Sequence, residues 1–104
     1  MAEYVGKPGE GVGLKDREEV KVPKRYKVLL HNDHYTTMDF VVHVLEQVFR
    51  RPQGEALRIM MNVHKNGMGV AGVYVKQIAE LKVDTVHALA KDHGYPLRCS
   101  LERE

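Results

Sequence analysis

The chain has a single cysteine, no tryptophan and no long apolar run, and each scarcity excludes a class of protein. Because Cys99 has no second cysteine to pair with, no intrachain disulfide can form, and a reducing cytoplasm is the expected compartment. No segment approaches the roughly 18 consecutive apolar residues that cross a bilayer, so we expect no membrane insertion. Sixteen Lys and Arg residues against 14 Asp and Glu leave a formal charge of only +2, which does not indicate nucleic-acid binding.

Glycine, proline and charged residues are concentrated at the start of the chain. Residues 1–25 hold four of the nine glycines and two of the four prolines, with few apolar residues among them. Such a composition cannot bury enough apolar surface to offset the entropy lost on folding. We therefore predict a flexible N-terminal extension over residues 1–23. The remaining residues, 24–104, are enough for one folded domain with a modest core.

Apolar periodicity predicts six elements in this domain. Short β-rich runs are expected at 26–31, 68–75 and 97–101, and helical stripes begin near residues 36, 53 and 76. Thr36 and Asp39 resemble a capping box, so we expect the first helix to begin there. The order β-α-α-β-α-β predicts an α+β sandwich of three strands backed by helices on one face.

Two motifs suggest ligand sites that their context does not support. Residues 67–72 (GMGVAG) match the dinucleotide fingerprint, but they follow a predicted helix and enter a strand, which reverses the required order. His31 and His34 flank Asp33, yet residues three apart on an extended segment point to opposite faces, and a structural zinc site needs more ligands. Cys99 lies in a predicted strand and is interpreted as a core residue. We expect no metal and no cofactor.

A polar turn after the first strand is the one candidate site that the residues themselves suggest. Its polar side chains, together with a histidine from the second helix, are Asn32, Asp33, His34, Thr36 and His64. The apolar residues expected to face them are Met38, Val41, Met60 and Val63. Such a cup suits an amphiphile with a cationic amine and an apolar side chain. An ordinary core with a capped helix explains the same residues, so both interpretations stay open.

Several segments, in this order and spacing, resemble the ClpS family of ATP-dependent Clp protease adaptors. They are YKVLLHNDHYTTMDFVVHVL, ALRIMMNVHKNG, GVAGVYV, AELKVDTV and YPLRCSLE, and they cover about residues 24–104. The resemblance implies a three-stranded antiparallel sheet packed against three helices, similar in architecture to a ribosomal stalk domain. The family also carries an N-terminal extension of the kind predicted over residues 1–23.

The resemblance implies a monomeric, non-enzymatic receptor for N-degrons in a bacterial cytoplasm. Such a receptor captures proteins that begin with Leu, Phe, Tyr or Trp and delivers them to the AAA+ unfoldase ClpA, the partner of the ClpP peptidase. Asn32 and His64 match the residues that bind the α-amino group, and Asp33 and His34 lie beside them. The residues that match the hydrophobic pocket, with Met38 as its gatekeeper, are Thr36, Met38, Val41, Met60, Met61, Val63 and Leu97.

Two residues depart from the family pattern. His34 stands where the family commonly has a second aspartate, so a group that can be cationic replaces a carboxylate near the amine. Gln77 stands where a glutamate is common on the surface that docks on the unfoldase, to which Lys82 also corresponds. The first change predicts weaker amine binding, and the second predicts altered docking on ClpA.

Two other function classes fit the residues less well. A small RNA- or ribosome-associated domain would need aromatic stacking residues, and the chain has only two Phe and no Trp. A metal-dependent protein would have to use the six histidines, and metal analysis of the purified protein would decide that question.

Overall fold

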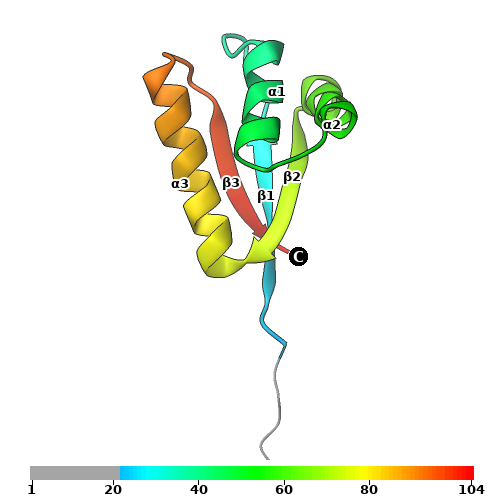
Figure 1. Cartoon of the computed structure of the whole chain (residues 1–104), viewed down its shortest axis with the longest axis vertical. Helices are drawn as coiled ribbons and strands as arrows, with labels where there is room; N and C mark the ends of the chain where they lie inside the picture. The colour runs from blue at the N-terminus through cyan, green and yellow to red at the C-terminus, as the bar shows by residue number, and fades with distance from the viewer. Residues whose placement is uncertain (1–21) are drawn as a thin grey trace, which may run out of the picture.

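The computed structural model describes residues 22–104, which form one sheet of three strands and three helices (Figure 1). In chain order the elements are β1 (Arg25–His31), α1 (Met38–Gln47), α2 (Gln53–Asn66), β2 (Met68–Val75), α3 (Lys76–Asp92) and β3 (Arg98–Arg103). Both strand pairings are antiparallel and the strand order is β2-β1-β3, which places β1 at the centre. The predicted α+β fold is therefore confirmed. The extension predicted over residues 1–23 falls almost wholly outside the described residues.

The core lies between the sheet and the helices. On β1, Val28 and Leu30 are fully buried, because alternate residues of a strand face the same side. The helices cover them with their apolar stripes, and α3 packs against all three strands. Cys99 on β3 is also buried, and its burial raises the pKa of the thiol to about 12, in agreement with a core role. None of the helices within residues 22–104 is long and apolar enough to cross a membrane.

The glycines of residues 67–72 serve the connection between α2 and β2. Gly67 ends α2 with a φ of 90°, a left-handed conformation that favours glycine, and its N–H donates to the Val63 carbonyl. A Cβ on Gly72 would lie 2.5 Å from the Tyr74 hydroxyl, because that ring folds back over the strand. The segment runs from helix to strand, as predicted, and its glycines are explained by a helix end and by close packing.

The cap of the first helix lies one residue later than predicted. Thr37, not Thr36, is the N-cap, and its hydroxyl oxygen accepts a hydrogen bond from the Phe40 N–H at 3.1 Å. The Thr36 hydroxyl instead donates to Asp33 Oδ2 at 2.8 Å. The predicted capping box is therefore wrong, because Thr36 is engaged by the preceding loop and leaves its neighbour to cap the helix.

Two cations hold the end of α1. Arg51 follows α1, and its Nε donates to the Ala71 carbonyl of β2 at 2.8 Å. The Lys82 ammonium of α3 donates to the Val48 carbonyl at 2.7 Å and lies 5.6 Å from the centre of the Tyr74 ring. Positive charge is favourable at a helix C-terminus, so Lys82 braces α1 against α3.

Replacing Lys82 with methionine is expected to lower the free energy of unfolding by about 1–2 kcal/mol, because the charged hydrogen bond to Val48 is lost. Lys76→Met, at the exposed start of the same helix, is the matched control. Urea unfolding of both variants measures the difference. Equal stability of the two variants would show that Lys82 is not a brace.

Candidate functional site

A cavity of about 230 Å³ lies between the β1–α1 loop and α2. Its lining residues are Asn32, Asp33, His34, Thr36, Met38, Val41, Met60, Val63 and His64. The loop supplies most of the polar groups, and α1 and α2 supply the apolar wall. The structure thus brings together the whole cup that the sequence suggested, from two segments about 30 residues apart in the chain.

A backbone hydrogen bond sets the two amine-binding candidates beside one another. The N–H of Asn32 donates to the Gly67 carbonyl at 2.9 Å, which ties the end of β1 to the end of α2. His64 lies in the last turn of α2, just before that glycine. The side chains of Asn32 and His64 are exposed and line the cavity. An amide oxygen and an imidazole nitrogen can both accept hydrogen bonds from a cationic amine.

Asp33 holds the shape of the loop. Its Oδ1 accepts hydrogen bonds from the N–H groups of Tyr35 at 2.8 Å and Thr36 at 2.7 Å, and its Oδ2 accepts from the Thr36 hydroxyl. Burial opposes ionisation, but the hydrogen bonds from Thr36 and Tyr35, with the charge of His34, outweigh it and lower the pKa of Asp33. Asp33 is therefore an anion whose acceptors are largely used by its own loop, which makes it a positioning residue.

Replacing Asp33 with alanine is expected to lower the free energy of unfolding by about 1–2 kcal/mol at neutral pH, because three hydrogen bonds to the carboxylate are lost. The pKa of Asp33 is lower in the folded state, so this stabilisation is present above the ordinary value of 3.8 and is lost as the pH falls through the lowered value. Unfolding at neutral and acid pH, with Asp84→Ala as control, tests the prediction. A stability difference that does not shrink in acid would contradict it.

Four other predicted residues lie away from the cavity. Met61 is on α2 with 37% of its surface exposed, and Leu97 is buried and lines a separate cavity on the far side of Tyr35. Gln77 is exposed in the first turn of α3, and Lys82 is engaged with the Val48 carbonyl. The structure places neither Met61 nor Leu97 in the cup.

The structure adds a polar pair that sequence reasoning missed. His31 Nε2 lies 2.6 Å from Ser100 Oγ, across the β1–β3 pairing and one residue before Asn32. Burial and then the charge of Arg98 lower the pKa of His31, so the ring is neutral at pH 7. Only the strand register brings these side chains together. Within residues 22–104, no three His, Cys, Asp or Glu side chains gather as a metal site.

A family model described as ATP-dependent Clp protease adaptor protein ClpS matches residues 21–100. The chain belongs to the ClpS family. The match includes every residue that lines the cavity and all of β1, α1, α2, β2 and α3. The resemblance inferred from the sequence segments is thereby confirmed.

Individual ClpS proteins are similar over most of their length. The ATP-dependent Clp protease adapter protein ClpS of Lawsonia intracellularis is 54% identical over 86 residues, 83% of this chain and 79% of that protein. The protein of the same name from Nitratidesulfovibrio vulgaris is 54% identical over 94 residues, 90% of this chain and 94% of that protein. The solved structure of Agrobacterium tumefaciens ClpS2 bound to L-phenylalaninamide has a TM-score of 0.76 and 42% identity, and the match covers 80% of this chain and 100% of that one.

Proposed function

We propose that this ClpS-family protein is an N-degron receptor that binds proteins beginning with Leu, Phe, Tyr or Trp and delivers them to the ClpA unfoldase of the ClpAP protease. The observation that carries the proposal is the single cavity in which Asn32 and His64 face an apolar wall. The similarity to a ClpS2 bound to L-phenylalaninamide supports it, because that compound joins a free α-amino group to an aromatic side chain. The protein acts by binding and performs no chemical step itself.

The polar side of the cavity suits a protein's free N-terminus. An α-amino group has an ordinary pKa of about 7.7–8.0, so it is largely cationic at neutral pH and carries three donors. Asn32 Oδ1 and a ring nitrogen of His64 accept two of them, and the Asp33 carboxylate supplies an attractive charge. Each hydrogen bond to the charged amine contributes roughly 1.5–3 kcal/mol.

The apolar wall of the cavity binds the side chain of the substrate's first residue. Met60, Val41 and Val63 are buried members of the core, and Met38 is 42% exposed at the rim. Methionine side chains adapt to ligands of different shape, so Leu and the aromatic residues can use the same wall. Burying a Leu or Phe side chain contributes about 1.5–3 kcal/mol. After the cost of association, an affinity near micromolar, about −8 kcal/mol, is expected.

His34 lines the cavity beside the candidate amine-binding residues, at a position where the family commonly has a second carboxylate. Replacing His34 with aspartate is expected to tighten binding of a Leu-led peptide about three- to tenfold, because the added negative charge attracts the cationic amine. Peptide fluorescence anisotropy of the two proteins is the measurement. Unchanged affinity in His34→Asp would exclude an electrostatic role for position 34.

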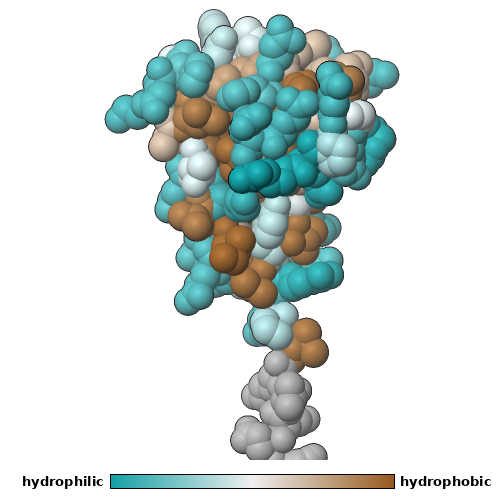
Figure 2. Space-filling view, viewed as in Figure 1, coloured by the Kyte–Doolittle hydropathy of each residue, from teal (hydrophilic) through white to brown (hydrophobic). Residues whose placement is uncertain are grey.

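The start of α3 is the proposed docking surface for the unfoldase. Figure 2 shows apolar surface at the lower end of the domain, where α3 begins. The exposed apolar residues there are Val75, Ile78 and Leu81, of which Leu81 is 60% exposed. These residues neighbour Gln77, which the resemblance to the ClpS family places on the surface that docks on the unfoldase. Lys82 lies on the same helix, and its ammonium donates a hydrogen bond to the Val48 carbonyl at the end of α1.

Degradation by purified ClpA and ClpP tests the proposal as a whole. We expect this protein to accelerate degradation of a fluorescent reporter that begins with Leu, and to leave the same reporter beginning with Met unaffected. A Leu81→Asp variant should bind Leu-led peptides normally but fail to accelerate degradation. Equal degradation of both reporters would overturn the proposed function.

A further inference from the structure

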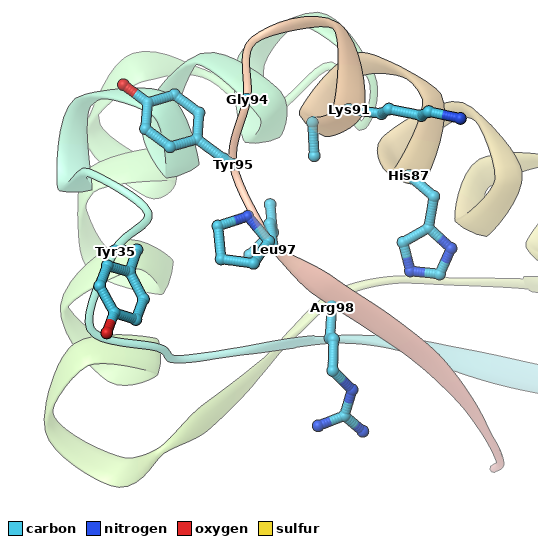
Figure 3. A pocket seen from close by; sticks show the side chains of 9 residues that line it. Tyr35, His87, Lys91, Gly94, Tyr95, Leu97 and Arg98 are labelled. Carbon is cyan, nitrogen blue, oxygen red and sulfur yellow. The ribbon is translucent and has the colours of Figure 1, made fainter.

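A second and larger cavity, of about 620 Å³, lies on the β3 side of the molecule (Figure 3). Its lining residues are Tyr35, His87, Ala90, Lys91, Gly94, Tyr95, Pro96, Leu97 and Arg98. Figure 3 shows Tyr35 and Tyr95 on one side and His87 and Lys91 on the other, with Leu97 between them. The Tyr95 ring is held against Phe40, with centroids 4.7 Å apart. The cavity therefore has an aromatic and aliphatic floor, formed by the β1–α1 loop, the end of α3 and the segment that leads into β3.

The polar groups around this floor are mostly hydrogen-bond donors. Within residues 22–104, Lys91 and Arg98 form no ion pair within 4.0 Å. The Cys99 N–H donates to His87 Nε2 at 3.1 Å, so in the neutral ring the proton is on Nδ1, which is a further donor. No carboxylate lines the cavity. Figure 3 shows the Lys91 ammonium and the Arg98 guanidinium at the edge of the cavity, directed away from Leu97. These flexible cations attract an anionic side chain that lies at this edge, and they repel a cationic one.

The two cavities share the β1–α1 loop as a wall. Tyr35 lines the larger one, while its neighbours His34 and Thr36 line the smaller one. Arg98 pairs with His31 in the sheet, directly before that loop. A peptide whose first residue fills the smaller cavity can pass over the exposed Tyr35 into the larger one. In an extended peptide the fourth residue lies roughly 10 Å beyond the first, and we place the fourth and fifth residues at the larger cavity.

We propose that the larger cavity is a second subsite for the substrate chain, which selects acidic side chains within an apolar segment just downstream of the N-degron residue. This inference rests on the proposed function, because the first residue must anchor the peptide. The subsite would add a preference for acidic downstream residues, which recognition of the first residue alone does not give. Lys91 and Arg98 are the specificity-determining residues, and Tyr35 is the contact over which the peptide passes.

Two labelled peptides that differ only in charge test the subsite. Both begin Leu-Gly-Gly, and residues four and five are Glu-Glu in one and Lys-Lys in the other. We expect anisotropy to show the Glu peptide binding about three- to tenfold more tightly, as exposed ion pairs allow. In the Lys91→Glu, Arg98→Glu double variant the preference should reverse. Leucinamide, which has no downstream residues, should compete equally well for both proteins.

A charge-matched control separates local contacts from overall charge. The Lys24→Glu, Lys76→Glu double variant changes the net charge equally at the opposite end of α3, beside a third cavity. It should keep the preference of the wild-type protein. Equal affinity for both peptides, or a reversal in the control as well, would overturn the subsite while leaving the N-degron site intact. Failure of all Leu-led peptides to bind would overturn both proposals.

Discussion

The Asn32→Ala variant is expected to bind a Leu-led peptide about 10- to 100-fold more weakly than the wild-type protein, because one hydrogen bond to the cationic amine is lost. The backbone N–H of Asn32 still donates to the Gly67 carbonyl, so the loop should keep its place. Binding weakens while stability stays the same, and this combination marks a ligand contact. His64→Ala should have an effect of the same order. Fluorescence anisotropy and urea unfolding measure the two properties.

Asn62→Ala is the matched control for this substitution. Asn62 lies on α2, near His64 in the chain, but its amide oxygen accepts a 3.5 Å hydrogen bond from Asn66 and does not line the cavity. Its replacement should leave peptide affinity unchanged. If Asn32→Ala and Asn62→Ala bind equally well, Asn32 does not hold the amine. In that case the cavity would depend on its apolar wall alone.

Met38 is expected to exclude first residues that branch at Cβ. Its side chain lines the cavity and is partly exposed. In the proposed binding mode, a β-methyl group of Ile or Val would meet this side chain. Wild-type protein should prefer Leu over Ile by about 10-fold or more, since one misplaced methyl group costs about 1–3 kcal/mol. In Met38→Ala the Ile peptide should bind within about threefold of the Leu peptide. The shorter alanine loses apolar contact with the Leu side chain and makes room for the β-methyl group of Ile.

Met61→Ala provides the comparison for Met38→Ala. Met61 is similarly exposed, at 37% against 42%, and does not line the cavity. Its replacement should leave the preference for Leu over Ile intact. Equal binding of Ile and Leu peptides to the wild-type protein would contradict the gatekeeper role of Met38. A loss of preference in Met61→Ala would instead place Met61 at the pocket.

The sequence patterns were sufficient for the fold. Apolar stripes located the start of α2 and the bounds of β2 within a residue, because Gly67 ends the helix directly before the strand begins at Met68. They failed at the start of α1, where two adjacent threonines competed for the cap. Asp33, which hydrogen-bonds Thr36, decided between them. Local spacing does not record such a loop interaction.

The site was less accessible to sequence reasoning than the fold. Residues of the polar turn are adjacent in the chain, and helical spacing places His64 over Met60, so the cup itself could be expected. Asp33 could not be recognised as a loop anchor, because its partners depend on how the turn closes. The bond from Lys82 to Val48 joins residues 34 apart, and His31 meets Ser100 only through strand register. Long-range partners of this kind require the folded chain.

In the proposed function, the cavity recognises a free N-terminus together with the first side chain. A comparison of one labelled Leu-led peptide with the same peptide acetylated at its amine decides whether it does. Acetylation removes the charge and two donors, so we expect the free peptide to bind near micromolar affinity and the acetylated one at least about 100-fold more weakly. Equal binding of the two peptides would show that the cavity does not recognise a free N-terminus.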